Sequence, residues 1–118
     1  MDSYNSMEVG WNVGLKLLLE KCIAEGIDVE KDVERYLSVH PDMIEVVDFA
    51  ITESRKQFPD ARLRLAVYRD PESGEESLTL YVKDSDELTL VEEKLLKITL
   101  ACADYLYNKS GWLSIMWE

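Results

Sequence analysis

Two short segments of the chain alternate between apolar and polar residues, whereas most of the rest shows helical spacing of apolar residues. The alternating segments are 63–67 and 78–82, where leucine and valine recur at every second position. This period is typical of strands that bury one face and expose the other. Pro71 and Gly74 lie between the two segments, within an acidic stretch. The pattern therefore predicts a β-hairpin with an exposed acidic turn.

Three helices are predicted before the hairpin. The first covers residues 9–25, whose apolar face consists of Trp11, Leu15, Leu18 and Cys22, widened by Leu19 and Ile23. Asp28 is placed to cap a second helix that runs to about Ser38. Pro41 suits the first position of a third helix, which ends before Pro59.

One helix and one strand are predicted after the hairpin. The segment Asp84-Ser85-Asp86-Glu87 resembles a helix start, and helical periodicity then continues to Asn108. A second apolar stripe on this helix comprises Leu96, Leu100, Ala103 and Tyr107. We therefore expect the helix to be buried on two sides, against the sheet and against an N-terminal helix. Residues 112–117 alternate and predict a closing strand.

These elements predict a single α+β domain spanning residues 1–118. N-terminal helices precede a β-β-α-β unit, whose three-stranded sheet carries helices mainly on one face. The right-handed rule for crossovers makes the last strand parallel to the second hairpin strand. We expect strand order 2-1-3, with the last strand beside the first hairpin strand, in preference to 1-2-3.

The charge of the chain bears on its partners. With 24 acidic and 13 basic residues the net charge is −11, which repels nucleic acid and attracts basic proteins. The same charge also serves solubility alone. Cys22 and Cys102 lie in separate helical patterns, as expected of reduced, buried thiols. With no leader-like start and no membrane-length apolar run, we expect a cytoplasmic protein without membrane partners.

The sequence contains few groups suited to catalysis. Its one histidine, His40, precedes Pro41 and fits a capping or interhelical role better than a catalytic one. One histidine and two cysteines in separate helices make a zinc site unfavourable. The five glycines are scattered and form no phosphate-binding loop. We expect a non-enzymatic protein with no catalytic residue, cofactor or metal.

The polar face of the predicted sheet differs from the acidic remainder. It would gather basic and aromatic residues, the types that are enriched at protein interfaces. This candidate interface consists of Arg62, Arg64, Tyr68, Tyr81, Lys83, Trp112 and Met116. Two other interpretations stay open: these side chains cover a solvent-facing sheet, or the N-terminal helices pack over them.

Residues 40–118 resemble a loose group of small, uncharacterised bacterial and archaeal proteins. The shared features are His40-Pro41 before a helix, Phe58-Pro59 before a strand, Asp70-Pro71-Glu72 in a hairpin, residues 78–82, and a final strand after an amphipathic helix. Some members of that group look like neighbours of toxin genes. The resemblance implies an accessory, antitoxin-like role and assigns no catalytic residue.

Two functions remain in view. The leading hypothesis is a module that binds another protein, for example a basic one, or a second copy of itself, through the outer sheet face or the acidic helices. The alternative is a small-molecule binding domain or weak enzyme, with a pocket between the sheet and the N-terminal helices. Trp11, Tyr36 and Tyr105 would line that pocket.

Overall fold

The computed structural model describes the backbone of residues 4–84 and 88–118 and the side chains of 13–84 and 90–118. The helices of this part are α1 (Tyr4–Ala24), α2 (Asp32–Val39), the 3₁₀ turn η1 (Pro41–Met43), α3 (Ile44–Gln57) and α4 (Leu88–Leu106). The strands are β1 (Asp28–Val29), β2 (Arg62–Arg69), β3 (Glu76–Lys83) and β4 (Leu113–Trp117). Among the described helices, none has the length and apolarity to cross a membrane. The predicted helix start at 84–87 lies mostly outside the described residues.

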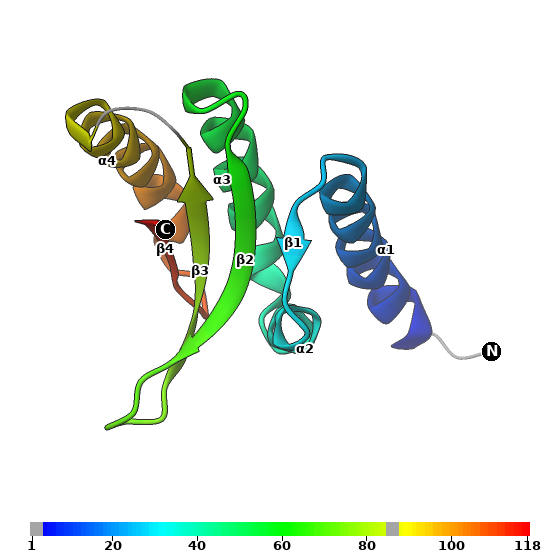
Figure 1. Cartoon of the computed structure of the whole chain (residues 1–118). Helices are drawn as coiled ribbons and strands as arrows, with labels where there is room; N and C mark the ends of the chain where they lie inside the picture. The colour runs from blue at the N-terminus through cyan, green and yellow to red at the C-terminus, as the bar shows by residue number, and fades with distance from the viewer. Residues whose placement is uncertain (1–3, 85–87) are drawn as a thin grey trace.

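The strands form one mixed sheet in the order β1-β2-β3-β4 (Figure 1). The hairpin β2–β3 is antiparallel, and both outer pairs are parallel. The α+β class and the parallel placement of the last strand are confirmed. The three-stranded sheet and the order 2-1-3 are wrong, because β1 occupies the side of β2 where the last strand was expected. Only the free edge of β3 then remains for β4.

Strand β1 replaces the predicted start of the second helix. Asp28 pairs with Arg64, and Val29 pairs with Leu65. The prediction that Asp28 caps a helix is therefore wrong. Helix α2 begins only at Asp32, and Lys31, at its N-cap position, makes no side-chain capping bond. Its start still carries acidic residues, which favour the positive end of the helix dipole.

The sheet has an apolar inner face and a mixed outer face. The buried inner residues of the hairpin are Leu63, Leu65, Leu78, Leu80 and Val82. The strand register places them on one side, as the alternation predicted. Helices α3 and α4 lie on the inner face of the sheet. The outer face of β2 and β3 is turned toward the viewer in Figure 1, and no described helix crosses it. The core therefore lies between the inner face of the sheet and the helices, and α1 and α2 also contribute buried residues to it.

Two predicted apolar helix faces are narrower than expected. On α1, Leu15, Leu18 and Cys22 are buried, but Ile23 is exposed, so widening the face to Ile23 is wrong. On α4, the first stripe packs inward through Val91, Ile98 and Cys102. Tyr105 stacks on Phe49 of α3, with ring centroids 4.2 Å apart. The second stripe is not buried against an N-terminal helix: Leu96, Leu100, Ala103 and Tyr107 are all exposed.

Candidate functional site

The structure brings all seven residues of the predicted interface to the outer face of the sheet. Across β2 and β3, Arg62 lies opposite Lys83 and Arg64 opposite Tyr81. Met116 of β4 lies beside Tyr81 on the other side. Side chains alternate along a strand, so Tyr68 belongs to the same face. Trp112 directly precedes β4 and continues its pattern, because its carbonyl accepts a hydrogen bond from the amide of Leu78 on β3. From here on, the outer sheet face means Arg62, Arg64, Tyr68, Tyr81, Lys83, Trp112 and Met116.

Three large side chains of the outer sheet face are open to solvent. The exposed fractions are 51% for Tyr68, 55% for Trp112 and 50% for Met116. Between them, Ala66 and Thr79 lie opposite each other and are buried. The centre of this face is therefore a shallow surface of small residues, bordered by aromatic and thioether side chains. Such side chains contribute much of the binding energy at protein interfaces.

Arg64 is held in place at the centre of a small charge network. Its guanidinium donates to Glu30 at 2.5 Å and to Glu118 at 3.0 Å. The same group lies 4.1 Å from the centre of the Tyr81 ring, which is a cation–π distance. The hydrogen bond to Glu118, with that to Glu30 beside it, raises the pKa of Arg64 despite the opposing effect of desolvation. Arg64 therefore contributes little uncompensated charge.

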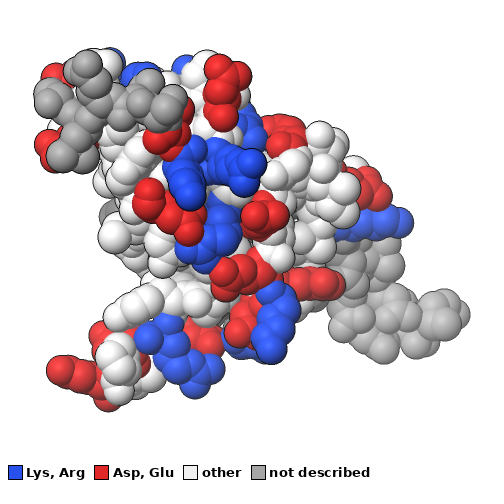
Figure 2. Space-filling view, in the orientation of Figure 1, with Lys and Arg blue, Asp and Glu red and all other residues white. Residues whose placement is uncertain are grey.

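Arg62 and Lys83 carry the uncompensated positive charge of this face. They are exposed neighbours across the hairpin, and neither makes an ion pair with a described residue. Figure 2 shows Lys and Arg side chains gathered over β2 and β3, with acidic groups beside them. The outer sheet face is thus locally basic inside an acidic molecule.

A second charge network joins the hairpin to α2. Glu76 accepts from Arg35 through both carboxylate oxygens, at 3.2 and 2.9 Å, and from Arg69 at 2.7 Å. The hydrogen bond from Arg35 is the largest cause that lowers the pKa of Glu76. A bidentate arginine–carboxylate pair fixes orientation as well as distance. This network links α2 to the turn end of the hairpin, next to Tyr68 in the sequence of β2.

A histidine, a serine and an aspartate meet where the loop before α3 contacts the loop before β4. Ser110 donates from its hydroxyl and its backbone amide to the two carboxylate oxygens of Asp42, both at 2.6 Å. Nδ1 of His40 lies 2.8 Å from the same hydroxyl. Burial acts to raise the pKa of Asp42, but the two hydrogen bonds from Ser110 outweigh it and lower the pKa.

This cluster does not have the geometry of a nucleophilic triad. In such a triad the aspartate orients the histidine, and the histidine takes the serine proton. Here the hydroxyl proton of Ser110 points to Asp42, so Nδ1 of His40 must donate to the serine oxygen. The ring of His40 also packs on Tyr36, with centroids 4.4 Å apart. The arrangement joins two loops, and the Ser110 hydroxyl donates to a carboxylate instead of to the imidazole of His40.

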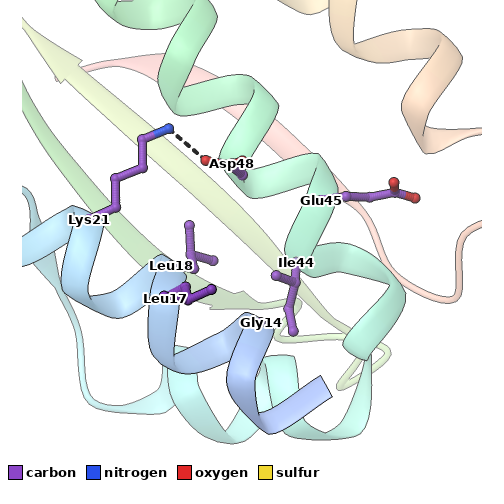
Figure 3. Close-up of a pocket in the computed structure, with 7 residues that line it drawn as sticks. All are labelled: Gly14, Leu17, Leu18, Lys21, Ile44, Glu45 and Asp48. Carbon is purple, nitrogen blue, oxygen red and sulfur yellow. Dashed lines mark hydrogen bonds and ion pairs between the residues drawn. The ribbon is translucent and has the colours of Figure 1, made fainter. Parts of the chain in front are cut away.

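A groove of about 400 Å³ lies between α1 and α3 (Figure 3). Leu17, Leu18 and Ile44 line its apolar part. At its polar end Lys21 donates to Asp48 at 2.6 Å and to Thr52 at 3.0 Å. The lysine is therefore already bound by groups of the protein itself. Figure 3 shows Glu45 pointing away from this pair.

The residues of the alternative pocket do not form one in the described structure. The side chain of Trp11 lies outside the described residues. Tyr36 is fully buried, and its hydroxyl accepts from the amide of Trp112 at 3.2 Å. Tyr105 instead stacks on Phe49 between α3 and α4. Tyr36 therefore fills the space beside the start of β4.

The contacts that complete these sites join residues far apart in the chain. Glu30 and Glu118 approach Arg64 from opposite ends of the sequence, and Asp42 meets Ser110. Sequence reasoning missed all four of these partners, because periodicity places a residue on a face but does not identify its long-range contact. Among the described residues, no group of three histidine, cysteine, aspartate or glutamate side chains is placed to hold a metal ion.

The chain matches no protein-family model, no curated protein and no solved structure.

Proposed function

We propose that this protein is a non-enzymatic module that binds another protein through the outer sheet face. One observation carries the proposal: no described helix covers this face, and three of its four large aromatic or thioether side chains, Tyr68, Trp112 and Met116, are each at least half exposed. Aromatic, methionine and arginine side chains in an uncovered patch are typical of protein-binding surfaces. The charge networks around Arg64 and Glu76 hold this patch in one shape before a partner arrives.

The partner we propose carries net positive charge overall and meets Arg62 and Lys83 with an acidic or polar patch, because the outer sheet face itself is locally basic. The net charge of −11 attracts a basic protein at long range and raises the rate of encounter. Binding energy then comes from the aromatic and thioether side chains that border the centre of the face, because exposed charges contribute little to affinity. An accessory, antitoxin-like role would be one form of this function. The reduced state of Cys22 and Cys102, both free and buried, fits the cytoplasm as its compartment.

Affinity capture from cells of the source organism, at physiological salt, tests this function. The test variant combines Tyr68→Ser and Arg62→Ser, which alter both ends of β2 on the outer sheet face. The control combines Ile23→Ser and Val39→Ser, two exposed apolar residues on helices. We expect a partner protein that binds wild type and control. The amount recovered with the test variant should be more than tenfold lower, and recovery should fall as salt increases. Recovery of no partner, or equal recovery by both variants, would contradict the proposal.

The α1/α3 groove supports a second candidate, a small-molecule binding domain. Its volume of about 400 Å³ lies in the range of ligand pockets. Thermal denaturation with a library of small metabolites tests this function. A ligand that raises the melting temperature of the wild type, but not of a Leu18→Trp variant that fills the groove, would support it.

A further inference from the structure

We propose that a second copy of this chain binds along the free edge of β4 and the adjoining face of α4. The pairing of the two β4 strands would join the two sheets into one. This surface shares Trp112 and Met116 with the outer sheet face, but it lies along the edge of β4 and on α4. The proposal does not rest on the function proposed above, because its evidence is the unpaired edge and the exposed stripe of α4. Its residues, named here the β4–α4 surface, are Leu96, Thr99, Leu100, Ala103 and Tyr107, together with Trp112, Leu113, Ile115 and Met116.

The backbone of β4 leaves one side unpaired. The amide of Leu78 donates to the carbonyl of Trp112 at 2.8 Å, and the amide of Glu118 donates to Val82 at 2.9 Å. In a regular ladder these bonds alternate along the strand. The even-numbered residues of β4 therefore bond to β3, and the odd-numbered residues direct their N–H and C=O groups away from the sheet. In the described part of the chain, no strand pairs with that side.

The free edge lacks the features that prevent sheet edges from pairing. Natural edge strands are commonly short, charged, bulged or interrupted by proline. The five residues of β4 have the sequence Leu-Ser-Ile-Met-Trp, which contains no charged residue and no proline. The opposite edge is formed by β1, which has only two residues and carries the charge of Asp28. Of the two edges of the described sheet, the β4 edge is therefore the better suited to a further strand.

The surface beside the free edge is apolar and contains a groove. A groove of about 290 Å³ lies between α4 and β4, and none of its lining residues is charged. Thr99 and Ala103 form part of its wall on α4. The apolar surface continues from Ala103 along the helix, where Leu96 is 58% exposed, Leu100 is 64% exposed and Tyr107 is 78% exposed. A contiguous apolar patch of this kind marks an interaction site.

The geometry of β4 suits a second copy of itself. If two β4 strands pair antiparallel about Ile115, Leu113 of each copy lies opposite Trp117 of the other. The backbone N–H and C=O groups of Leu113, Ile115 and Trp117 all point away from β3, so the two strands can form on the order of six hydrogen bonds. A two-fold axis through Ile115 also brings the two α4 helices together, because each runs along its own β4. The result is one sheet of eight strands, four from each copy.

The size and charge of the surface also fit a dimer. Its five large exposed side chains offer about 600 Å² of apolar area per copy, and the strand edge adds to this, against roughly 800 Å² for a stable interface. Two copies of charge −11 repel each other, which favours contact through a surface without acidic residues. Salt screens that repulsion. Added salt should therefore strengthen self-association, whereas it should weaken binding of a basic partner.

The test measures mass by sedimentation equilibrium for wild type and two matched variants. The interface variant combines Leu96→Asp and Ala103→Asp on α4, and the control combines Leu17→Asp and Ala24→Asp on α1. All four positions are exposed, so neither variant should unfold. We expect wild type and control near twice 13.6 kDa and the interface variant near 13.6 kDa, with circular dichroism confirming that all are folded. Wild type that stays monomeric up to roughly 0.1 mM, or an interface variant that stays dimeric, overturns the proposal.

Amide hydrogen exchange locates the contact within β4. The amides of Ile115 and Trp117 should become protected as protein concentration rises, whereas Met116 should be protected at every concentration because it bonds to β3. If the protein dimerises but the protection of Ile115 and Trp117 does not depend on concentration, the contact lies elsewhere and pairing through the β4 edge is rejected. The capture experiment on Tyr68 and Arg62 has an independent outcome, because neither residue lies on the β4–α4 surface. A monomer that still captures a partner would reject the self-association alone.

Discussion

Gly111 lies against the side chain of Tyr36. A β-carbon built on Gly111 would be 2.3 Å from the phenolic oxygen of Tyr36 and 2.9 Å from Cγ of Met43. The same phenolic oxygen accepts a hydrogen bond from the amide of Trp112. This close approach anchors the start of β4 to α2, and it therefore helps to set the position of Trp112 on the outer sheet face.

Replacement of Gly111 by alanine should destabilise the fold. The added methyl group must displace two buried side chains, and overpacking of this kind costs about 2 kcal/mol. Urea denaturation measures the change in the free energy of unfolding. Gly14→Ala is the matched control: its nearest neighbour is 4.0 Å away, and alanine in a helix is more stable than glycine by up to about 1 kcal/mol. A stability unchanged by Gly111→Ala would contradict this packing.

Acid should remove the contribution of Asp42 to stability. Its lowered pKa means that the folded state favours the ionised carboxylate, so the stabilisation is present above the unfolded pKa, near 4, and is lost as pH falls through the folded pKa. Asp42→Asn should therefore destabilise the protein by about 1 kcal/mol at pH 7 and by less at pH 3. Urea denaturation at both pH values checks this, with exposed Asp60→Asn as control. A constant difference between wild type and Asp42→Asn would count against it.

Cys102 should be unreactive while the protein is folded. Burial, with a smaller contribution from Glu53, raises the pKa of its thiol to about 11. At pH 8 only about one thiol in a thousand is then ionised, compared with about one in four for a free cysteine. In a Cys22→Ala variant, alkylation by iodoacetamide should be at least a hundredfold slower in the folded state than in denaturant. Equal rates in the two states would show that Cys102 is accessible.

Ser54 offers a simple way to stabilise the protein. Its hydroxyl is fully buried and has no hydrogen-bond partner among the described residues. Alanine removes this unpaired polar group and suits the helix better than serine. Ser54→Ala should raise the free energy of unfolding by about 1 kcal/mol, as measured in urea. Destabilisation would mean that the hydroxyl has a partner in solution.

Local patterns in the sequence predicted most of the helices and the hairpin. A period of two fixes which side of a strand each residue occupies, which is why the seven named residues lie on one face; that this face is an interface stays a prediction. Strand β1 has only two residues and no period, and it is defined by pairing with Arg64 and Leu65. Without β1, the free side of β2 could not be recognised as occupied, so the order of the strands was wrong.

The second stripe of α4 shows a different limit. An apolar stripe predicts that a surface is covered but does not identify the covering group. Here the described part of the chain leaves Leu96, Leu100 and Tyr107 exposed. The pairing of Asp42 with Ser110 likewise joins residues 68 positions apart and leaves no periodic signal.

Site-specific photo-crosslinking in cells of the source organism most directly tests whether the outer sheet face binds a partner. A photoreactive phenylalanine analogue would replace Tyr68 in one variant and Val39, a helical residue that is more exposed than Tyr68, in another. We predict a single covalent adduct with a basic protein from position 68 and none from position 39. No adduct at position 68, or the same adduct from both positions, would contradict the proposal that this face binds a partner protein.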